Sequence, residues 1–438
     1  MKHSQVFSIS FCSQIVAVCA STSGSFDILS LNVAGLPPIL NGNDVPGDKA
    51  TNARTIGSRF TQYSYDIINV QEDFNYHAYI YETDSHPYRT ATSGGAGIGS
   101  GLNTLSNFNW INFSRNKWDD CSNASGADCL TPKGFTFLRT KLDSSVFIDI
   151  YNLHADAGTE ASDEAARTKN LNQVAAYINI WSNGNAVLVF GDTNSRYTRM
   201  ADNVKSFSDQ AGLTDVWIEQ IRLGVIPTQE TICDNPSKTN DCETVDKIFY
   251  RGSPIVDLRA TSFQYESLRF LQANGSMLSD HNPISANFNW QLSTSLRQSD
   301  FLGGPHGSWY SDVSALAGIA NPKPSSITFR GASRLDSVSL TLSTGQTFTH
   351  GGTGGSSSSL TLASDEYWVK ATMCQGKYRD YTRLFSIEAT TSKTNRVSAG
   401  TKTSDCQYFE APQGWQIVGF IGQDGDEIDQ LSFVYAPI

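Results

Sequence analysis

Short apolar runs recur along residues 26–290 and are separated by polar or glycine-containing segments. Five of these runs predict strands, because apolar residues are concentrated in four to seven positions between turn signals: 26–32, 66–72, 186–190, 247–250 and 284–288. The last two signals are the weakest.

Two other patterns complete this region. Apolar and polar positions alternate in 135–142 and 146–153, so these strands could pair as a hairpin across 143–145. Helical spacing predicts a helix over about 163–182, and Gly184 stands where a left-handed cap would end it. Helices, hairpins and buried strands together predict an α/β fold with a mixed sheet.

The pattern changes after residue 290. Residues 291–300 are polar and unpatterned, which is typical of a linker. Residues 301–438 carry short strands at nearly regular spacing, with glycine-rich turns and no long helical pattern. The Gly- and Ser-rich stretch 351–359 could be a flexible linker, but similar strands on both sides favour a turn inside one all-β module.

The N-terminus predicts a secretory leader. Lys2 precedes a mostly apolar stretch that ends in small residues, so residues 1–20 are expected to be a signal peptide and the protein to be secreted. The alternative is a disordered or buried N-terminal strand. No later run is long and apolar enough to span a membrane.

Cleavage after residue 20 would leave six of the eight cysteines. They form three close couples, which favour local disulfides although other connectivities stay open: Cys121 with Cys129, Cys233 with Cys242, and Cys374 with Cys406. Asn112, Asn123 and Asn274 begin glycosylation sequons, which a secreted chain could use.

The charge of −11 disfavours a protein that holds nucleic acid through a broad basic surface. We therefore expect no stable nucleic-acid partner. The charge does not disfavour an enzyme that places a divalent cation between itself and a phosphate.

Four predicted strands of the first region end on polar residues or are followed by them: Asn32, Glu72, His154, and Asp192 with Asn194. Near the end of the region come Asp246, and Asp280 with His281. Each residue alone is typical of a turn or of solvated surface. Ligand sites in α/β sheets gather at strand ends, however, so the combination predicts one site.

The residue types indicate what that site could do. Oxygen ligands such as Glu72, Asn32 and Asp280 suit Mg²⁺, which often shares its coordination with a substrate phosphate. His154 and His281, with nearby carboxylates, could transfer protons. Mn²⁺ or Ca²⁺ would be alternatives to Mg²⁺.

Residues 26–290 resemble the endonuclease/exonuclease/phosphatase superfamily. The motifs that carry the resemblance are Leu31-Asn32, Gln71-Glu72, Asn152-Leu153-His154, Gly191-Asp192-Thr193-Asn194 and Ser279-Asp280-His281. The resemblance implies a four-layer, DNase-like α/β sandwich of two sheets over residues 21–290, with a metal-dependent phosphoesterase site at one end.

The resemblance also implies roles. Glu72 would bind the metal with help from Asn32 and Asp280, and Asp192 and Asn194 would orient water or phosphate. His281 would act as general base or stabilise the transition state, with Asp246 as its partner, and His154 would donate to the phosphate or leaving group. Thr193 and Lys247 stand where the family commonly has aromatic residues, which leaves the substrate open.

The substrate could be a lipid head group, another small phosphodiester or a nucleic acid. A nuclease would use scattered basic residues that could equally be solvated surface: Arg89, Arg115, Lys117, Arg139, Arg196 and Arg199.

A lipid enzyme would use an apolar loop at a membrane surface. Candidate apolar residues, which could equally be core, are Phe108, Trp110, Phe113, Trp118, Leu268, Phe270 and Leu271. Secretion and net acidity slightly favour the lipid or small phosphodiester.

Residues 301–438 resemble jacalin-related lectins, which form a three-sheet β-prism. The matching segments are 301–312, His350-Gly-Gly-Thr-Gly-Gly355 and 419–435. The resemblance implies glycan binding by five positions: Gly304, Gly425, Asp426, Glu427 and Asp429. The two acidic residues Asp426 and Glu427 are unusual there, so a prism without sugar function stays open.

The leading hypothesis is a secreted, extracellular, Mg²⁺-dependent phosphoric-ester hydrolase whose lectin module binds glycans near its substrate, with a membrane surface as a further contact. The alternative is a glycan-binding protein whose first domain is inactive.

Overall fold

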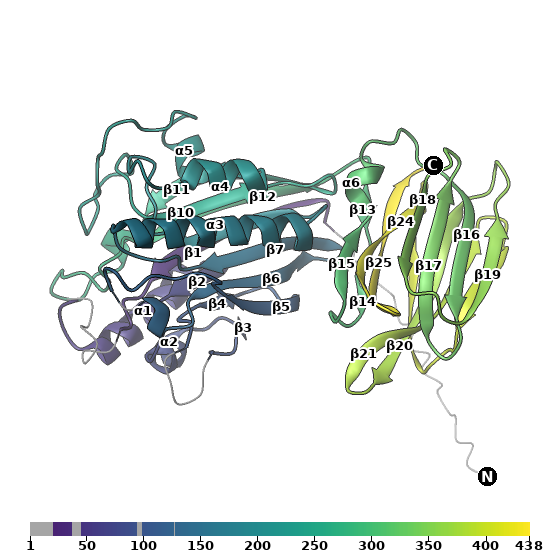
Figure 1. Cartoon of the computed structure of the whole chain (residues 1–438), viewed down its shortest axis with the longest axis horizontal. Helices are drawn as coiled ribbons and strands as arrows, with labels where there is room; N and C mark the ends of the chain where they lie inside the picture. The colour runs from purple at the N-terminus through teal and green to yellow at the C-terminus, as the bar shows by residue number, and fades with distance from the viewer. Residues whose placement is uncertain (1–20, 37–44, 94–98, 127) are drawn as a thin grey trace, which may run out of the picture.

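The computed structural model describes residues 21–36, 45–93, 99–126 and 128–438, and it has two domains side by side (Figure 1). The expected signal peptide, residues 1–20, lies outside the described residues. The first domain ends with strand β12 (Ile284–Leu292). Within the expected linker 291–300, Arg297–Gln298 forms strand β13, which pairs with the second domain.

The first domain contains two six-stranded sheets. One has the order β11-β12-β1-β2-β4-β3. Its remaining strands are β1 (Ser23–Asn32), β2 (Ile67–Gln71), β3 (Tyr88–Arg89), β4 (Asn103–Ser106) and β11 (Val256–Tyr265). β1 and β2 run parallel, and the other pairings in this sheet are antiparallel.

The other sheet has the order β5-β6-β7-β8-β10-β9. Its strands are β5 (Trp110–Lys117), β6 (Gly134–Asp143), β7 (Val146–Leu153), β8 (Ala186–Asp192), β9 (Thr214–Asp215) and β10 (Asp246–Arg251). β6 and β7 form the predicted antiparallel hairpin, whereas β7 and β8 run parallel.

Side-chain alternation builds four layers. On β8, Leu188 and Phe190 pack into the core between the sheets, whereas Val187 and Val189 face the helices. Helices α3 (Ala161–Trp181) and α4 (Val204–Ala211) cover that outer face. Helices α1 (Lys49–Tyr63) and α2 (His77–Thr83) cover the outer face of the other sheet, and the short α5 (Val216–Gln220) packs beside β10 and β11. The expected four-layer sandwich is confirmed.

The second domain is the expected all-β prism. Three sheets carry the orders β13-β25-β24-β15, β18-β17-β16-β19 and β22-β21-β20-β23, and β14 also pairs with β25. The strands are β14 (Leu302–Gly303), β15 (Ser308–Ser311), β16 (Pro324–Gly331), β17 (Leu335–Leu342), β18 (Thr347–Gly351), β19 (Ser356–Thr361), β20 (Trp368–Tyr378), β21 (Tyr381–Thr391), β22 (Arg396–Gly400), β23 (Asp405–Glu410), β24 (Trp415–Asp424) and β25 (Ile428–Pro437).

Two local features of the prism add to what its sequence pattern predicted. The short helix α6 (Val313–Leu316) was not predicted, because four residues give too little periodicity to detect. Residues 356–361 of the Gly- and Ser-rich stretch form β19 and pair with β16, so the stretch lies inside the prism.

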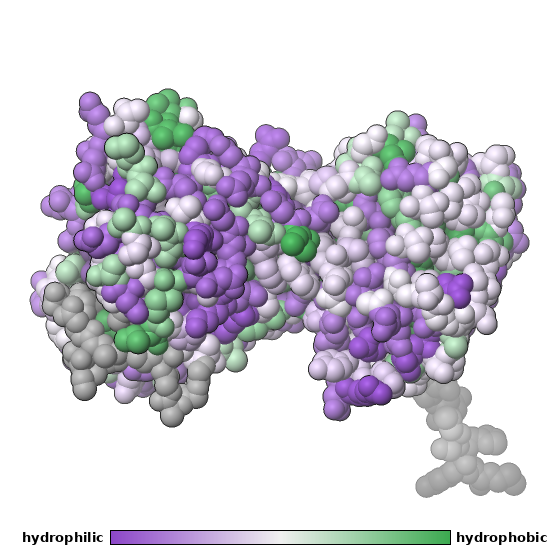
Figure 2. All heavy atoms as spheres, viewed as in Figure 1, coloured by the Kyte–Doolittle hydropathy of each residue, from purple (hydrophilic) through white to green (hydrophobic). Residues whose placement is uncertain are grey.

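The two domains differ in surface character. Figure 2 shows mostly pale, near-neutral residues on the visible face of the prism and more strongly hydrophilic residues on the first domain. The exposed serines of β19 contribute to that near-neutral surface of the prism. Over the part of the chain that the structure describes, no helix combines the length and apolarity needed to cross a bilayer.

Candidate functional site

A pocket of about 390 Å³ lies where strands of both sheets end. Glu72 directly follows β2, His154 follows β7, and Asp192 is the last residue of β8. These side chains line the pocket with His281, which comes from the segment before β12. The two parallel pairs, β1 with β2 and β7 with β8, bring their carboxyl ends to this one edge of the domain.

Asp192 is the centre of a hydrogen-bonded cluster. Its Oδ2 accepts from Asn32 Nδ2 at 3.3 Å and lies 3.4 Å from His154 Nε2 and 3.8 Å from His281 Nε2. His281 Nδ1 contacts Asp246 Oδ2 at 2.9 Å. The predicted His281–Asp246 pair is therefore present, with its other ring nitrogen directed toward Asp192.

Asn32 directs its amide nitrogen toward the carboxylates. Nδ2 donates to Glu72 Oε1 at 3.2 Å, while Oδ1 accepts the Ala34 N–H at 3.0 Å in a local turn. The Asn32 carbonyl accepts a hydrogen bond from the Ser279 hydroxyl at 2.5 Å. In this arrangement the Asn32 amide nitrogen lies beside the carboxylates of both Glu72 and Asp192.

Two residues of the cluster have an unusual backbone. Glu72 has φ 53° and Asn194 has φ 49°, in the left-handed region that side chains other than glycine rarely adopt. The turn at Asn194 lets its N–H donate to Asp192 Oδ1 at 2.8 Å. Such backbone costs about 1–3 kcal/mol per residue and is concentrated at functional sites.

The two histidines have opposite electrostatic surroundings. Burial by itself would lower the pKa of His281, but the carboxylates of Asp246, Asp192 and Asp280 outweigh burial and raise that pKa well above its usual value. Burial, reinforced by Lys133 and His281, lowers the pKa of His154 well below its usual value. The surroundings therefore make His281 the more basic and His154 the less basic of the two imidazoles.

The Asp192 carboxyl is shifted as well. Burial raises its pKa to about 6, with the nearby Asp246 charge adding to the rise and His281 opposing it. Asp192 thus titrates within reach of neutral pH when no cation is bound.

Lys133 is a pocket residue that the sequence analysis missed. Its Nζ lies 3.1 Å from His154 Nε2 and forms an ion pair with Asp128, and both Lys133 and Asp128 line the pocket. Lys133 directly precedes β6, which runs antiparallel to β7. The amino end of β6 therefore lies at the site, and a search restricted to residues that follow strands could not find it.

Asp280 lies at the edge of the cluster. Its side chain is exposed and does not line the pocket, but its charge raises the pKa of His281. Burial lowers the pKa of Lys49, and the charges of Asp280 and Glu72 oppose that effect.

The donor set fits a divalent cation. Glu72 and Asp192 line the pocket, and the ligand atoms of Asp192, Asp246 and His281 lie within 4.8 Å of one another. Asp246 Oδ1 is buried and has no hydrogen-bond partner among the described residues. Several carboxylates with one unsatisfied buried oxygen suit a hard cation such as Mg²⁺.

Part of the pocket lining is apolar. It includes Leu36, Phe74, Leu130 and Ala157, and Leu130 is 75 % exposed. Leu130 directly follows Cys129, which is bonded to Cys121. The structure also contains the Cys233–Cys242 and Cys374–Cys406 disulfides, so all three couples pair locally as the sequence favoured.

The basic residues considered for a nuclease lie elsewhere. Within the described residues, none of the six lines the pocket. Four of them form ion pairs with carboxylates: Arg89 with Asp84, Arg139 with Asp149, Arg196 with Glu230, and Arg199 with Asp202. Among the apolar candidates for a membrane-facing loop, Trp118 and Phe270 are buried, as their core alternative predicted, and Leu268 is exposed.

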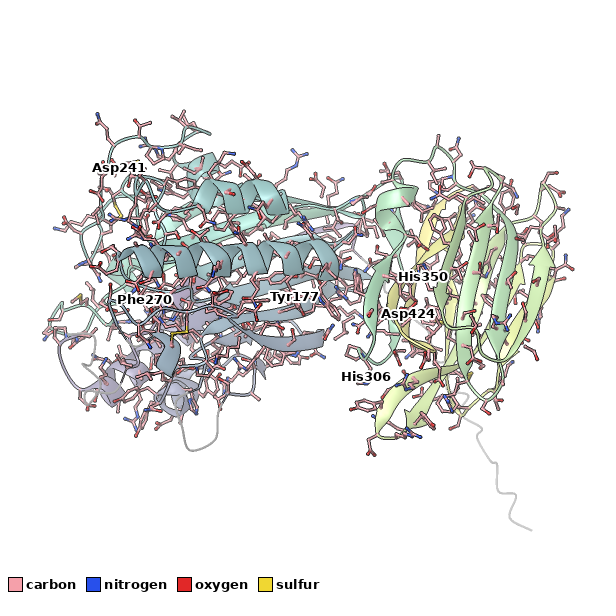
Figure 3. The ribbon with its side chains drawn as sticks, in the orientation of Figure 1. Tyr177, Asp241, Phe270, His306, His350 and Asp424 are labelled. Atoms are coloured by element: carbon pink, nitrogen blue, oxygen red, sulfur yellow. A yellow bond between two sulfur atoms is a disulfide. The ribbon has the colours of Figure 1, made fainter. Side chains whose placement is uncertain are left out.

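The expected sugar site of the prism lies between two loops. The Gly304 N–H donates to the Asp429 carbonyl at 2.9 Å, which joins the opening loop to β25. Gly304 is buried, and a Cβ there would lie 2.7 Å from the Thr382 carbonyl of β21. Gly425 and Asp426 are exposed at the tip of the closing turn. Figure 3 shows His306 and Asp424 on the side of the prism toward the first domain.

Two of the three acidic side chains expected at the sugar site, Asp429 and Glu427, are already paired. Arg383 of β21 binds the Asp429 carboxylate, and Arg334 forms a two-point ion pair with Glu427. Burial raises the pKa of Asp429 to about 6, although Arg383 opposes that rise. A saccharide hydroxyl would therefore compete with Arg383 for the Asp429 carboxylate.

The comparisons with known proteins agree with this two-part organisation. Residues 49–222 match the profile of endonuclease/exonuclease/phosphatase family 2, and residues 299–434 match the jacalin-like lectin domain. Sphingomyelinases of Mycobacterium bovis and Mycobacterium tuberculosis are 36% identical over 275 residues, which are 61% of this chain and 53% of each relative. The chain thus spans about half the length of the curated relatives it matches.

Solved structures match each part separately. Beta toxin of Staphylococcus aureus is 16% identical with a TM-score of 0.45, covering 60% of this chain and 99% of the toxin. A mannose-binding jacalin-related lectin from Ananas comosus is 19% identical with a TM-score of 0.29, covering 33% of this chain and 99% of the lectin. The chain therefore contains an endonuclease/exonuclease/phosphatase-family domain followed by a jacalin-like lectin domain.

Proposed function

We propose that the first domain is a divalent-metal-dependent phosphodiesterase that hydrolyses the head group of a phospholipid, and that the prism binds glycans near that substrate. The observation that carries the proposal is the composition of the pocket. Carboxylates and two histidines line it together with the apolar side chains of Leu36, Phe74 and Leu130. A lipid phosphodiester has the same division, with a charged phosphate beside an apolar body.

Each catalytic side chain has a role that its surroundings support. His281, held by Asp246 and positively charged, stabilises negative charge on the phosphoryl oxygens or leaving group. Lys133 and His154 lie together beside Asp192 and orient the phosphate. Asn194 and Asn32 hold the Asp192 carboxylate.

Glu72, Asp192 and Asp246 would hold the cation. When bound, Mg²⁺ would supply positive charge to the phosphate and favour deprotonation of the attacking water. The same cation would offset part of the acidic field that raises the pKa of His281. The acidity of this edge of the domain thus supports phosphate binding only with a cation present.

The distribution of cations favours a small head group over nucleic acid. Duplex or single-stranded nucleic acid is held through several phosphate contacts along a basic surface. Here Lys133 lines the pocket, whereas the arginines considered for a nuclease do not line it and are mostly paired with carboxylates. The 36% identical relatives are named sphingomyelinases, so sphingomyelin is the first substrate to test.

We also propose that the protein is secreted. Three disulfides support an oxidising compartment. Among the sequons, Asn123 and Asn274 are exposed and could accept a glycan, whereas Asn112 on β5 is partly buried.

A substrate panel tests the proposed activity. The purified full chain is incubated with sphingomyelin in mixed micelles, phosphatidylcholine, plasmid DNA and bis(p-nitrophenyl) phosphate, each with Mg²⁺ or with EDTA. We expect phosphocholine release from a choline lipid in Mg²⁺ and its loss in EDTA. Hydrolysis of DNA alone would replace the lipid proposal, and no turnover of any substrate would favour the inactive, glycan-binding alternative.

A further inference from the structure

A layer of buried amide side chains joins the two sheets directly beneath the pocket. Gln71 and Asn152 belong to the motifs that contain Glu72 and His154, yet neither lines the pocket. Both are buried, and Gln71 Nε2 donates to Asn152 Oδ1 at 2.8 Å. This hydrogen bond connects β2 of one sheet with β7 of the other.

Further bonds of the same layer also cross between the sheets. Asn152 Nδ2 donates to the Val70 and Asn103 carbonyls, each at 3.0 Å. In the opposite direction, Asn69 Nδ2 donates to the Tyr151 and Phe190 carbonyls at 3.2 and 3.0 Å. Asn152 and Asn69 thus each bond to the backbone of the facing sheet.

Such a layer is not needed to fill the core. The remaining space between the sheets is filled by apolar side chains such as Ile148, Leu188 and Phe288, which pack without directional bonds. A buried amide is costly unless its hydrogen bonds are made, and those bonds tolerate little displacement. The layer therefore determines the spacing and register of the two sheets more sharply than apolar packing alone would.

The layer lies one or two residues before the groups of the site. Gln71 directly precedes Glu72, Asn152 stands two residues before His154, and Phe190 stands two residues before Asp192. Glu72 comes from one sheet, whereas His154 and Asp192 come from the other. We propose that Gln71, Asn152 and Asn69 are positioning residues that set the separation of Glu72 from Asp192 and His154, and so determine how well the site holds a divalent cation.

This proposal rests on the proposed metal-dependent function, and its central test does not depend on turnover. Gln71→Met removes the amide with little change in side-chain size. We expect the Kd for Mg²⁺, measured by titration calorimetry on the full chain without substrate, to rise roughly 10- to 100-fold, the usual range for residues that orient metal ligands. The kcat for the head-group substrate should fall by a similar factor.

Tyr151→Phe is the matched control. Like Asn152, Tyr151 is buried and lies on β7, and its hydroxyl is 2.7 Å from the Ser182 hydroxyl. Its side chain, however, packs in the core beneath the outer helices. The control loses a buried hydrogen bond and should lower the Tm without changing the Kd for Mg²⁺.

The double variant Gln71→Met with Asn152→Leu removes the bonds of both amides to the facing sheet. It leaves the buried Val70 and Asn103 carbonyls unpaired, so we expect its Tm to fall below that of Gln71→Met and its Mg²⁺ affinity to be at least as weak. If Gln71→Met does not fold, Thr104→Val removes the milder bond to Asn69 Oδ1 at 2.6 Å and should give a smaller rise in Kd.

The outcomes are distinguishable. A lower Tm with an unchanged Kd for Mg²⁺ in Gln71→Met, or in Thr104→Val if that variant is used, would overturn the positioning role and leave the proposed function intact. A wild-type protein that neither binds Mg²⁺ nor hydrolyses any phosphodiester would overturn the proposed function, and the positioning role with it.

Discussion

The opposite pKa shifts of His154 and His281 are caused by their neighbours. His281 is surrounded by three carboxylates, whereas His154 lies beside the Lys133 ammonium and is almost fully buried. Two side chains of the same type thus have different proton affinities within one pocket, as is common for acid–base pairs in enzymes.

His281→Ala should lower kcat on the head-group substrate by roughly 10²-fold or more, because it removes the positive charge beside the reacting phosphate. Asp246→Asn should have a smaller effect, since the imidazole remains but loses its charged partner at 2.9 Å. Steady-state kinetics with sphingomyelin measure both. A His281→Ala enzyme within tenfold of wild type would contradict the assigned site.

His86 is predicted to make stability depend on pH. Its ring lies between Asp84 Oδ1 and the Tyr65 carbonyl, each at 2.6 Å, so both nitrogens must carry protons to donate. Burial alone would lower the pKa of His86, but Asp84 and the carbonyl raise it above the usual value. The stabilisation is therefore complete below pH about 6.5 and is lost as pH rises through the higher folded-state pKa.

The measurement compares wild type with His86→Gln by denaturant unfolding at pH 6 and pH 9. We expect the wild type to be more stable by about 1.5–3 kcal/mol at pH 6, the range for hydrogen bonds to charged groups, and by clearly less at pH 9. An equal difference at both pH values would show that His86 is not charged in the folded protein.

At the scale of elements, the direction of each strand determines which of its ends reaches the pocket. Residues after β1, β2, β7 and β8 could be selected from the sequence because parallel neighbours end together. Lys133 could not, because it precedes an antiparallel strand, and strand direction follows from sheet pairing. The amide layer between the sheets could not be predicted from the sequence either, because Gln71 and Asn69 bond to residues 81 and 121 positions away in the chain.

The β20–β21 hairpin should control glycan binding through Arg383. Its guanidinium occupies the Asp429 carboxylate that would accept a sugar hydroxyl. Arg383→Ala is therefore expected to increase binding of neutral saccharides several-fold on a glycan array, and Asp429→Ala to abolish it. Arg396→Ala removes an exposed arginine that pairs with Glu388 in the same module and serves as the control. Weaker binding in Arg383→Ala would instead make Arg383 a direct glycan ligand.

At the scale of the whole molecule, the prism packs against the end of the sheet remote from the pocket. Asp300 accepts from Ser145 N at 2.8 Å and Lys141 Nζ at 2.7 Å, at the β6–β7 turn. The pocket lies at the other end of β7, whose eight residues span about 25 Å at roughly 3.3 Å each. The lectin module can therefore contact a surface without covering the pocket.

Trp309 of the prism is the central side chain of this interface. It packs over the Arg139 guanidinium at 3.4 Å from the ring centre, and its indole N–H donates to the Asn183 carbonyl at 3.2 Å. Trp309→Ala should cost about 3–5 kcal/mol, the usual range for truncating a buried Trp. It should also split one calorimetric transition into two, because the domains would no longer unfold together.

Tyr367→Ala is the control for that experiment, since Tyr367 also carries a cation–π contact, with Lys323, but entirely within the prism. It should destabilise the prism without uncoupling the domains. A single transition in Trp309→Ala, shifted no more than in the control, would mean that the contact does not couple the domains.

The sequence alone determined the order and type of the two domains, because hydrophobic periodicity and short motifs are local properties of the chain. It also identified the site residues at the ends of β1, β2, β7 and β8, because polar side chains stand directly at the ends of these apolar strands. Only the tertiary structure decided that Asn32 donates to carboxylates, that Lys133 enters the pocket, and that Arg383 covers Asp429. Each of those depends on a contact across sheets, strands or loops that are far apart in the chain, and no local pattern encodes its geometry.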